Sequence, residues 1–146
     1  MKKNGFTLIE VLIAIILVGV AIASLVAANI TFTRANIVGT NLSTAEFLVE
    51  QIRERTAPVS YTDLRLVLFG NSNLDTAPPF SPPINANGDH LEALAGFSQQ
   101  VTVENVNASN FEQVDVSHTS SFIRVTVKVL WNGDEITSVS WIRAKY

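Results

Sequence analysis

The sequence predicts an α+β fold in which one long N-terminal α-helix packs on a C-terminal antiparallel β-sheet. Three observations support this prediction. An uncharged, largely apolar run covers residues 11–33, and a helical period of apolar residues continues to about residue 55. From Phe97 onward, apolar residues instead alternate with polar ones, which is the period of a half-buried strand. Asn132-Gly133 divides the last alternating stretch, as in a tight hairpin.

The length and composition fit one soluble domain of moderate size joined to the apolar run. The chain has 146 residues, a formal net charge of −3 and 47% hydrophobic residues. The acidic balance argues against a general nucleic-acid binder, whose surface carries a basic patch. The sequence contains no cysteine, which excludes disulfides, zinc–thiolate sites and thiol nucleophiles. The domain must therefore be held by its own core or by assembly.

The uncharged run from Val11 to Thr33 is long enough to cross a membrane. Its 23 residues would span roughly 35 Å as a helix, against about 30 Å for the hydrocarbon core of a bilayer. Lys2 and Lys3 lie on the short leading side of the run. We therefore expect that side in the cytoplasm and the bulk of the chain on the other side of the membrane.

Glu10 is a carboxylate at the head of this run, where hydrocarbon makes an unpaired charge costly. A secretory signal peptide would explain Lys2 and Lys3 and would offer Ala21-Ile22-Ala23 as a cleavage site. However, the run is longer than such a peptide needs and continues past that site. A plain membrane anchor fits the length but gives Glu10 no function. In a third alternative, Glu10 snorkels to the membrane interface, since it lies near the edge of the run.

The stretch KKNGFTLIEV, residues 2–11, closely resembles the class III signal of type IV pilins and type II secretion pseudopilins. In that family a short basic leader ends in glycine, and a prepilin peptidase cuts after the glycine on the cytoplasmic side. The new N-terminal residue is N-methylated, and the fifth mature residue is a glutamate. The resemblance implies cleavage after Gly5, N-methylation of Phe6 and an assembly role for Glu10. Cleavage would leave 8 basic residues against 13 acidic ones, a formal net charge of −5.

The resemblance also gives Glu10 a physical reason for its position. Cleavage leaves a positively charged amine on Phe6, and in a fibre Glu10 can pair with the amine of a neighbouring subunit. Both charges are poorly solvated in lipid or in a helical core, so pairing matters more there than in water. Replacing Glu10 would leave an unpaired buried amine, and we expect poorer incorporation into filaments.

The resemblance and the periodicity together predict four parts: a leader, residues 1–5; a transmembrane and assembly helix, 6–33; its amphipathic continuation, 34–57; and a β-rich head, 58–146. The continuous helix is expected from Phe6 to Arg55, and Pro58 ends the pattern. Pilin-like subunits have such a long helix, with its second half packed on a sheet. The side facing the sheet is expected to consist of Val38, Leu42, Ala45, Val49 and Ile52, which recur at steps of three and four.

The head is expected to begin with irregular structure and to end in strands. Residues 60–70 fit a short strand or a helical turn. Residues 71–89 are expected to form a loop, since two proline pairs disfavour helix and central strand. This loop is either a site of partner contact or a surface connection. Strands are expected at Phe97–Val103, Phe111–Val116, Phe122–Trp131 and Glu135–Lys145.

A type I′ turn at Asn132-Gly133 predicts the register of the last hairpin. It places Val129 opposite Ile136, and Ile123 opposite Ile142, on the face toward the helix. Val127 and Val125 would lie opposite Ser138 and Ser140. On the other face, Arg124 would lie opposite Trp141 as a cation–π pair.

No residues stand out as a catalytic or metal-binding motif: G-x-S-x-G, a phosphate-binding loop and H-E-x-x-H are all absent from the sequence. His90 and His118 are single residues in polar stretches and are expected on the surface. Glu50 and Glu54 are one helical turn apart, on an expected solvated face. Residues 85–89 (NANGD) have some oxygen-ligand character for calcium, but turn chemistry explains them better.

The sequence thus predicts a structural subunit rather than an enzyme, with no catalytic residue, cofactor or metal. The resemblance implies four partners: the prepilin peptidase, other pilin or pseudopilin subunits, an inner-membrane assembly platform and membrane lipid. It implies a single-pass inner-membrane protein with a cytoplasmic N-terminus and a periplasmic head, later assembled into a pilus or pseudopilus.

Alternatives remain within and outside the family. A minor pilin of a type IV pilus is the first expectation, and a minor pseudopilin of a type II secretion system is the second. A membrane-anchored subunit for DNA or ligand uptake should carry a basic strip on its head; the acidic net charge disfavours this, so no nucleic acid is expected. A soluble enzyme behind a signal peptide would need catalytic residues that the sequence does not offer.

Overall fold

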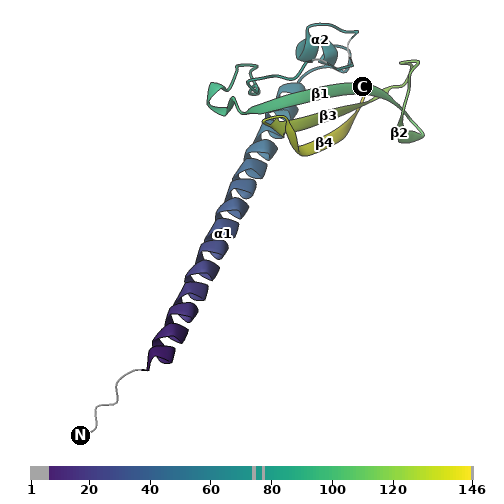
Figure 1. The fold of residues 1–146 in the computed structure, drawn as a ribbon. Helices are drawn as coiled ribbons and strands as arrows, with labels where there is room; N and C mark the ends of the chain where they lie inside the picture. The colour runs from purple at the N-terminus through teal and green to yellow at the C-terminus, as the bar shows by residue number, and fades with distance from the viewer. Residues whose placement is uncertain (1–6, 74, 77, 146) are drawn as a thin grey trace. The chain divides into compact units, whose positions relative to one another are not determined.

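A computed structural model describes residues 7–73, 75, 76 and 78–145. The chain divides into two compact units, Met1–Thr40 and Asn41–Tyr146. Helix α1, Leu8–Thr56, begins in the first unit and ends in the second (Figure 1). It has 49 residues and confirms the expected continuous helix. The predicted leader and the helix start at Phe6 lie outside the described residues.

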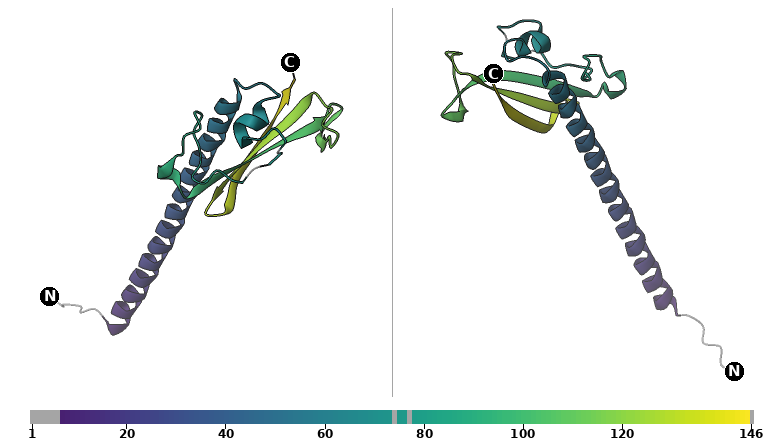
Figure 2. Two further views of the ribbon diagram at one scale, coloured as in Figure 1. Left: turned by 90° about the horizontal axis from the view of Figure 1, so that it is seen from above. Right: turned by 180° about the vertical axis from the view of Figure 1, so that it is seen from behind.

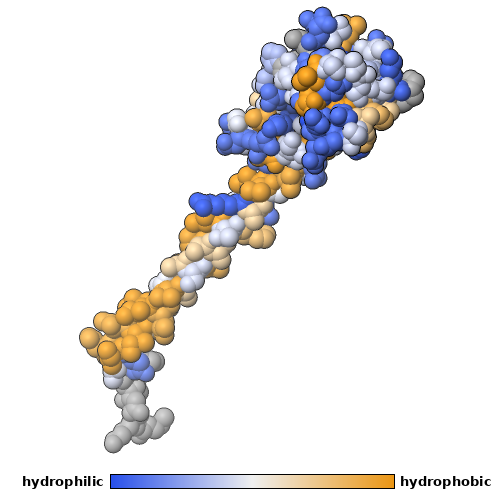
Figure 3. Space-filling view, turned by 90° about the vertical axis from the view of Figure 1, so that its right-hand side faces the viewer, coloured by the Kyte–Doolittle hydropathy of each residue, from blue (hydrophilic) through white to orange (hydrophobic). Residues whose placement is uncertain are grey.

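In the first unit, every described residue of α1 is exposed in the single chain, residues 8–40. Figure 3 shows the apolar side chains of its N-terminal part in orange. The hydroxyls of Ser24, Thr31 and Thr33 donate to the carbonyl oxygens four residues earlier, at 2.8–3.0 Å. These polar groups are therefore satisfied within the helix. Within the described residues, α1 is long and apolar enough to cross a membrane.

The second unit contains the end of α1 and a four-stranded antiparallel sheet in the order β2-β1-β3-β4. Figure 2 shows the sheet in two further views. A short helix α2 and a 3₁₀ turn η1 precede the sheet. The bounds are α2 Leu64–Phe69, η1 Glu92–Leu94, β1 Phe97–Asn107, β2 Asn110–Val114, β3 Phe122–Trp131 and β4 Asp134–Ala144. The α+β prediction is confirmed.

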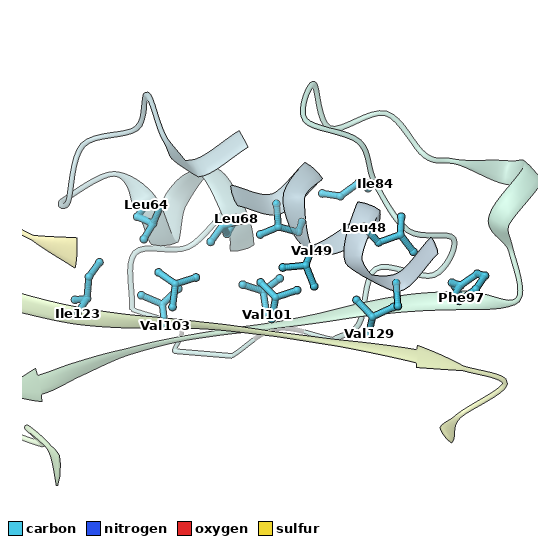
Figure 4. Close-up of a cluster of buried hydrophobic side chains, with 14 residues drawn as sticks. Leu48, Val49, Leu64, Leu68, Ile84, Phe97, Val101, Val103, Ile123 and Val129 are labelled. Carbon is cyan, nitrogen blue, oxygen red and sulfur yellow. The ribbon is translucent and has the colours of Figure 1, made fainter. Parts of the chain in front are cut away.

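The core of the second unit lies between the last turns of α1 and alternate residues of β1 and β3. Figure 4 shows Leu48 and Val49 of α1 above Val101, Val103 and Val129 of the strands. All five are buried, and α2 and the loop before β1 complete the core. Burial of apolar surface stabilises the folded state by about 25 cal/mol per Å². The contacts between these side chains therefore hold the sheet against the last turns of α1.

The predicted apolar stripe on α1 is only partly correct. Ala45, Val49 and Ile52 are buried, but Val38 and Leu42 are 66% and 41% exposed. The first buried residue of the helix is Ala45, and the core cluster of the second unit includes no earlier residue of α1 among those that the structure describes. Leu48, which the stripe omitted, is completely buried, since a sheet covers a wider arc of a helix than one line of side chains.

The predicted hairpin turn is correct, but the register beyond it is wrong by one residue. Asn132 and Gly133 both have positive φ, 50° and 94°, as a type I′ turn requires. Ile136 is then an extra residue in β4, because Leu130 pairs with Glu135 and Val129 already pairs with Thr137. Ile136 packs against the core. This bulge shifts every later pair.

The bulge changes the neighbours that the sequence predicted. Ile123 pairs with Arg143, Val125 with Trp141, and Val127 with Val139. Ile142 therefore lies on the solvent side, and Trp141 packs against the core. The predicted contact between Arg124 and Trp141 is wrong. Arg53 lies over the Trp141 ring at 5.7 Å, and Arg124 forms an ion pair with Glu104 at 2.8 Å.

The ambiguous segment is helical, and the loop that follows it is partly tied to the sheet. Helix α2 ends at Phe69, and Gly70 follows it with a φ of 66°, which is favourable for glycine. Within the predicted loop, Phe80 and Gln99 exchange backbone hydrogen bonds of 2.8 and 3.1 Å. Val103 of β1 donates to the Asp75 carbonyl at 2.7 Å. The loop therefore covers one edge of β1 instead of extending freely into solvent.

Candidate functional site

Glu10, the predicted assembly residue, lies in the first turn of α1 and is exposed. Its Oε2 atom accepts hydrogen bonds from the Thr7 backbone N–H and the Thr7 hydroxyl, both at 3.4 Å. The Glu10 N–H in turn donates to the Thr7 carbonyl at 3.1 Å. A Thr-x-x-Glu pair with a side chain reaching back is typical of a helix start. A carboxylate also interacts favourably with the positive end of the helix dipole.

The side chain of Glu10 lies at one end of an apolar strip on the same helix. The strip consists of Val11, Ala14, Ile15 and Val18, which recur at one-turn spacing. The long Thr7 contacts leave the Glu10 carboxylate accessible in the single chain. This arrangement presents one carboxylate beside a surface that lipid or another apolar helix can cover. Gly5 and Phe6, the other two predicted site residues, lie outside the described residues.

The second unit contains a polar cluster at one end of β1 that sequence reasoning missed. Asn105 is 3% exposed, and its side chain accepts from Arg65 at 2.9 Å and donates to the Tyr61 hydroxyl at 2.8 Å. Arg65 also forms an ion pair with Asp75 at 2.8 Å. Tyr61 donates to the Ser120 carbonyl at 2.8 Å. These bonds join α2, β1 and the loop before β3.

His118 was expected to be a single surface residue, and its side chain is exposed. However, its Nδ1 atom lies 3.1 Å from Asn105 Oδ1. The Asn105 oxygen can only accept, so Nδ1 carries the proton in this contact. The contact ties the loop before β3 to β1. His90, also exposed, has its Nδ1 atom 3.0 Å from the Pro82 carbonyl oxygen.

Asp115 holds the loop before β3 in place. Its carboxylate accepts hydrogen bonds from the hydroxyl of Ser117 and from the backbone N–H groups of Ser117, Thr119 and Ser120. The Ser117 hydroxyl, followed by the backbone donors, lowers the pKa of Asp115 to about 2. Donors of this kind favour the ionised form. Asp115 is therefore a structural anion.

The segment weighed as a calcium site forms a turn. Asn85 Oδ1 accepts from the backbone N–H groups of Asn87 and Asp89, both at 2.9 Å. The Gly88 N–H donates to the Asn85 carbonyl at 3.0 Å. These oxygens are used within the turn, as the turn interpretation expects. Over the described ranges, no group of three His, Asp or Glu residues could hold a metal ion.

Comparison with known proteins gives one match, at the N-terminal end. Residues 1–26 match the family model of the prokaryotic N-terminal methylation motif. The matched range contains Gly5, Phe6, Glu10 and residues 11–26 of the apolar run. Neither the curated proteins nor the solved structures gave a match to the chain.

Proposed function

Because the N-terminal methylation motif and the pilin-like α+β fold support the type IV pilin and pseudopilin family, we infer that this chain is a filament subunit cleaved after Gly5 and N-methylated at Phe6. It is a structural subunit, processed by a prepilin peptidase and assembled with other pilin-type subunits. Its N-terminal helix anchors it in the membrane before assembly.

One observation carries this proposal: the methylation motif runs directly into a helix whose apolar side chains have no cover in the single chain. Residues 8–40 of α1 are all exposed, whereas the core of the second unit begins at Ala45. Exposed apolar area of this extent is costly in water. Lipid before assembly and neighbouring helices after assembly supply the cover.

Glu10 has a specific task in this scheme. Its carboxylate lies beside the apolar strip, and within the described residues it has only the long Thr7 contacts. In a helical fibre core it would pair with the Phe6 amine of a neighbouring subunit. A carboxylate–amine pair in a poorly solvated core is costly to break, since the remaining charge is left buried. Glu10 would therefore control how neighbouring helices align.

Within the family, we favour a minor pilin of a type IV pilus. The head has no cysteine, unlike the disulfide-bounded C-terminal region of many pilins, and a subunit present in few copies needs less surface bonding. A minor pseudopilin of a type II secretion system is the alternative. In both cases the head would lie in the periplasm, the N-terminus in the cytoplasm and the helix across the inner membrane, next to an assembly platform.

Uptake of nucleic acid is a weaker proposal, because four of the five basic side chains of the head are engaged within the described residues. Arg65, Arg124 and Lys128 form ion pairs with Asp75, Glu104 and Glu135. Arg143 donates to two backbone carbonyls at 2.7 Å. A nucleic-acid surface instead needs basic groups free to reach phosphates.

Processing is tested by intact mass and N-terminal sequencing of the protein from membranes, with and without the prepilin peptidase. We expect a peptidase-dependent chain that starts at N-methylated Phe6. A start at Met1 with the peptidase present would reduce the protein to a plain membrane anchor. A start near Ser24 would make it an exported soluble protein.

Assembly is tested by Glu10→Ala, with Glu46→Ala as the matched control. Both glutamates are exposed on α1, but only Glu10 lies within the methylation motif. We expect processing of both variants and a loss of at least tenfold in filament incorporation for Glu10→Ala alone, measured by immunoblotting of sheared filaments. Equal incorporation of the two variants would refute the role of Glu10.

A further inference from the structure

The two edges of the sheet are built differently. On one side, β2 has only five residues, includes the charged Glu112, and pairs with β1 through a register shift. The rest of β1 is covered by backbone bonds to Asp75 and Phe80. Short, irregular and charged edges resist pairing with other chains. On the other side, β4 has 11 residues, and after the bulge at Ile136 its pairing with β3 runs without a further shift from Thr137 to Ala144.

The outer edge of β4 is open. Within the described part of the chain, its residues make no backbone hydrogen bond outside the pairing with β3. From Ile136 to Ile142 the sequence ITSVSWI has no charge, proline or glycine. Ser138, Val139 and Ser140 are exposed along this stretch. Such an edge presents unpaired N–H and C=O groups to a further strand.

The charges at the two ends of β4 are opposite. Asp134 and Glu135 lie at the hairpin end, and Arg143 and Lys145 at the other end. Glu135 bonds to Lys128, and Arg143 bonds to the carbonyls of Thr56 and Val59. Asp134 and Lys145 have no side-chain hydrogen bond or ion pair among the residues that the structure describes. One free acid and one free base thus flank an uncharged strand.

We propose that β4 pairs antiparallel with β4 of a second copy of this chain, so that two four-stranded sheets become one. Antiparallel pairing brings the acidic end of each strand beside the basic end of the other, whereas parallel pairing in register would place like charges together. With Val139, the middle residue of β4, opposite its own copy, Ser138 lies opposite Ser140. This contact is made between heads and goes beyond the helix-mediated assembly proposed above.

The absence of cysteine in the chain allows a direct test with single-cysteine variants of the full chain in membranes. Cβ atoms of directly opposed residues lie about 4.5–5.5 Å apart, close to the range for a disulfide. We expect Val139→Cys to give a disulfide-linked dimer on mild oxidation, at least fivefold more than Gln113→Cys. Gln113 is the matched control, because it is exposed on the other edge strand.

The direction of pairing is tested by coexpressing Ser138→Cys with Ser140→Cys. We expect more cross-linked dimer from the mixture than from either variant alone. Equal yields from Val139→Cys and Gln113→Cys would indicate random collision and would overturn the proposal. Efficient self-cross-linking of Ser138→Cys and of Ser140→Cys, with no gain on mixing, would indicate parallel pairing and would also overturn it.

A disruptive variant provides a second measurement. Val139→Lys should reduce cross-linking of the Ser138→Cys and Ser140→Cys mixture at least fivefold, since it adds a charge on the edge strand, and tryptophan fluorescence checks that the head stays folded. Unreduced cross-linking would contradict the edge contact. Repeating the cross-linking in a chain that also carries Glu10→Ala separates the two proposals. Cross-linking that persists in this chain supports β4 pairing even if assembly through the helix fails. Loss of cross-linking in this chain would overturn the proposal that β4 pairs independently of the helix.

Discussion

Gln99 is the residue of the head whose replacement gives the sharpest test of the fold. It is completely buried in β1. Its Oε1 atom accepts from the Ile84 N–H at 2.7 Å, and its Nε2 atom donates to the carbonyls of Ile84 at 3.1 Å and Leu48 at 2.9 Å. This one amide therefore connects the loop before β1 to helix α1.

The expected loss of stability in Gln99→Leu follows from the backbone groups that would lose their hydrogen-bond partner. The N–H and C=O of Ile84 would lose these bonds while Ile84 stays 4% exposed, whereas the Leu48 carbonyl lies within α1. Each buried group left without a partner costs about 1–3 kcal/mol, and the added apolar surface of leucine offsets part of this. We expect a loss of about 3 kcal/mol in the free energy of unfolding, roughly a 100-fold change in equilibrium.

The assay is urea unfolding of the full chain in detergent, followed by the fluorescence of Trp131 and Trp141, both in the head. With a slope of about 2 kcal/mol per molar urea, the midpoint should fall by roughly 1.5 M. Gln100→Leu is the matched control, because Gln100 is the next residue and is only partly buried. Equal midpoints for the two variants would refute the role assigned to the buried amide.

Three further outcomes are expected in the same unfolding assay. Leu48→Ala should cost about 2–5 kcal/mol through a core cavity, and Leu42→Ala, at an exposed site, less than about 1 kcal/mol; similar costs would contradict the corrected stripe. Asp115→Asn should destabilise the head at pH 6. Because the pKa of Asp115 is lowered to about 2, its contribution is present above about pH 4 and is lost as the pH falls from about 4 to about 2. The difference from the native chain should therefore shrink in that range, and a constant difference would contradict this. Gly88→Ala should destabilise the head, because φ is 92° and an added Cβ would meet the Arg55 guanidinium; an unchanged midpoint would contradict this.

The errors in the sequence prediction have one physical source, which is distance along the chain. Gln99 reads as a polar residue on a strand, and its burial depends on Ile84 and Leu48. The predicted hairpin register was wrong because Ile136 is an extra residue in β4. The alternating pattern of the sequence does not distinguish such an inserted residue from one that continues the strand. As a result, Arg53 of α1 lies over the ring of Trp141, where the sequence predicted Arg124.

The sequence by itself determined the features that depend on neighbouring residues. The methylation motif, the 49-residue helix, the type I′ turn at Asn132-Gly133 and the presence of strands after Phe97 all follow from local composition and period. Gly5, Phe6 and Glu10 as site residues also rest on the sequence and stay predictions.

Only the tertiary structure decided which residues are buried and which edge of the sheet is open. Within the second unit, Leu48 is buried and Leu42 is exposed because the core packs against α1 from Ala45 onward. The edge of β1 is covered and that of β4 is not, because the loop through Asp75 and Phe80 follows one side of the sheet. These outcomes depend on contacts between segments far apart in the sequence, which local periodicity does not specify.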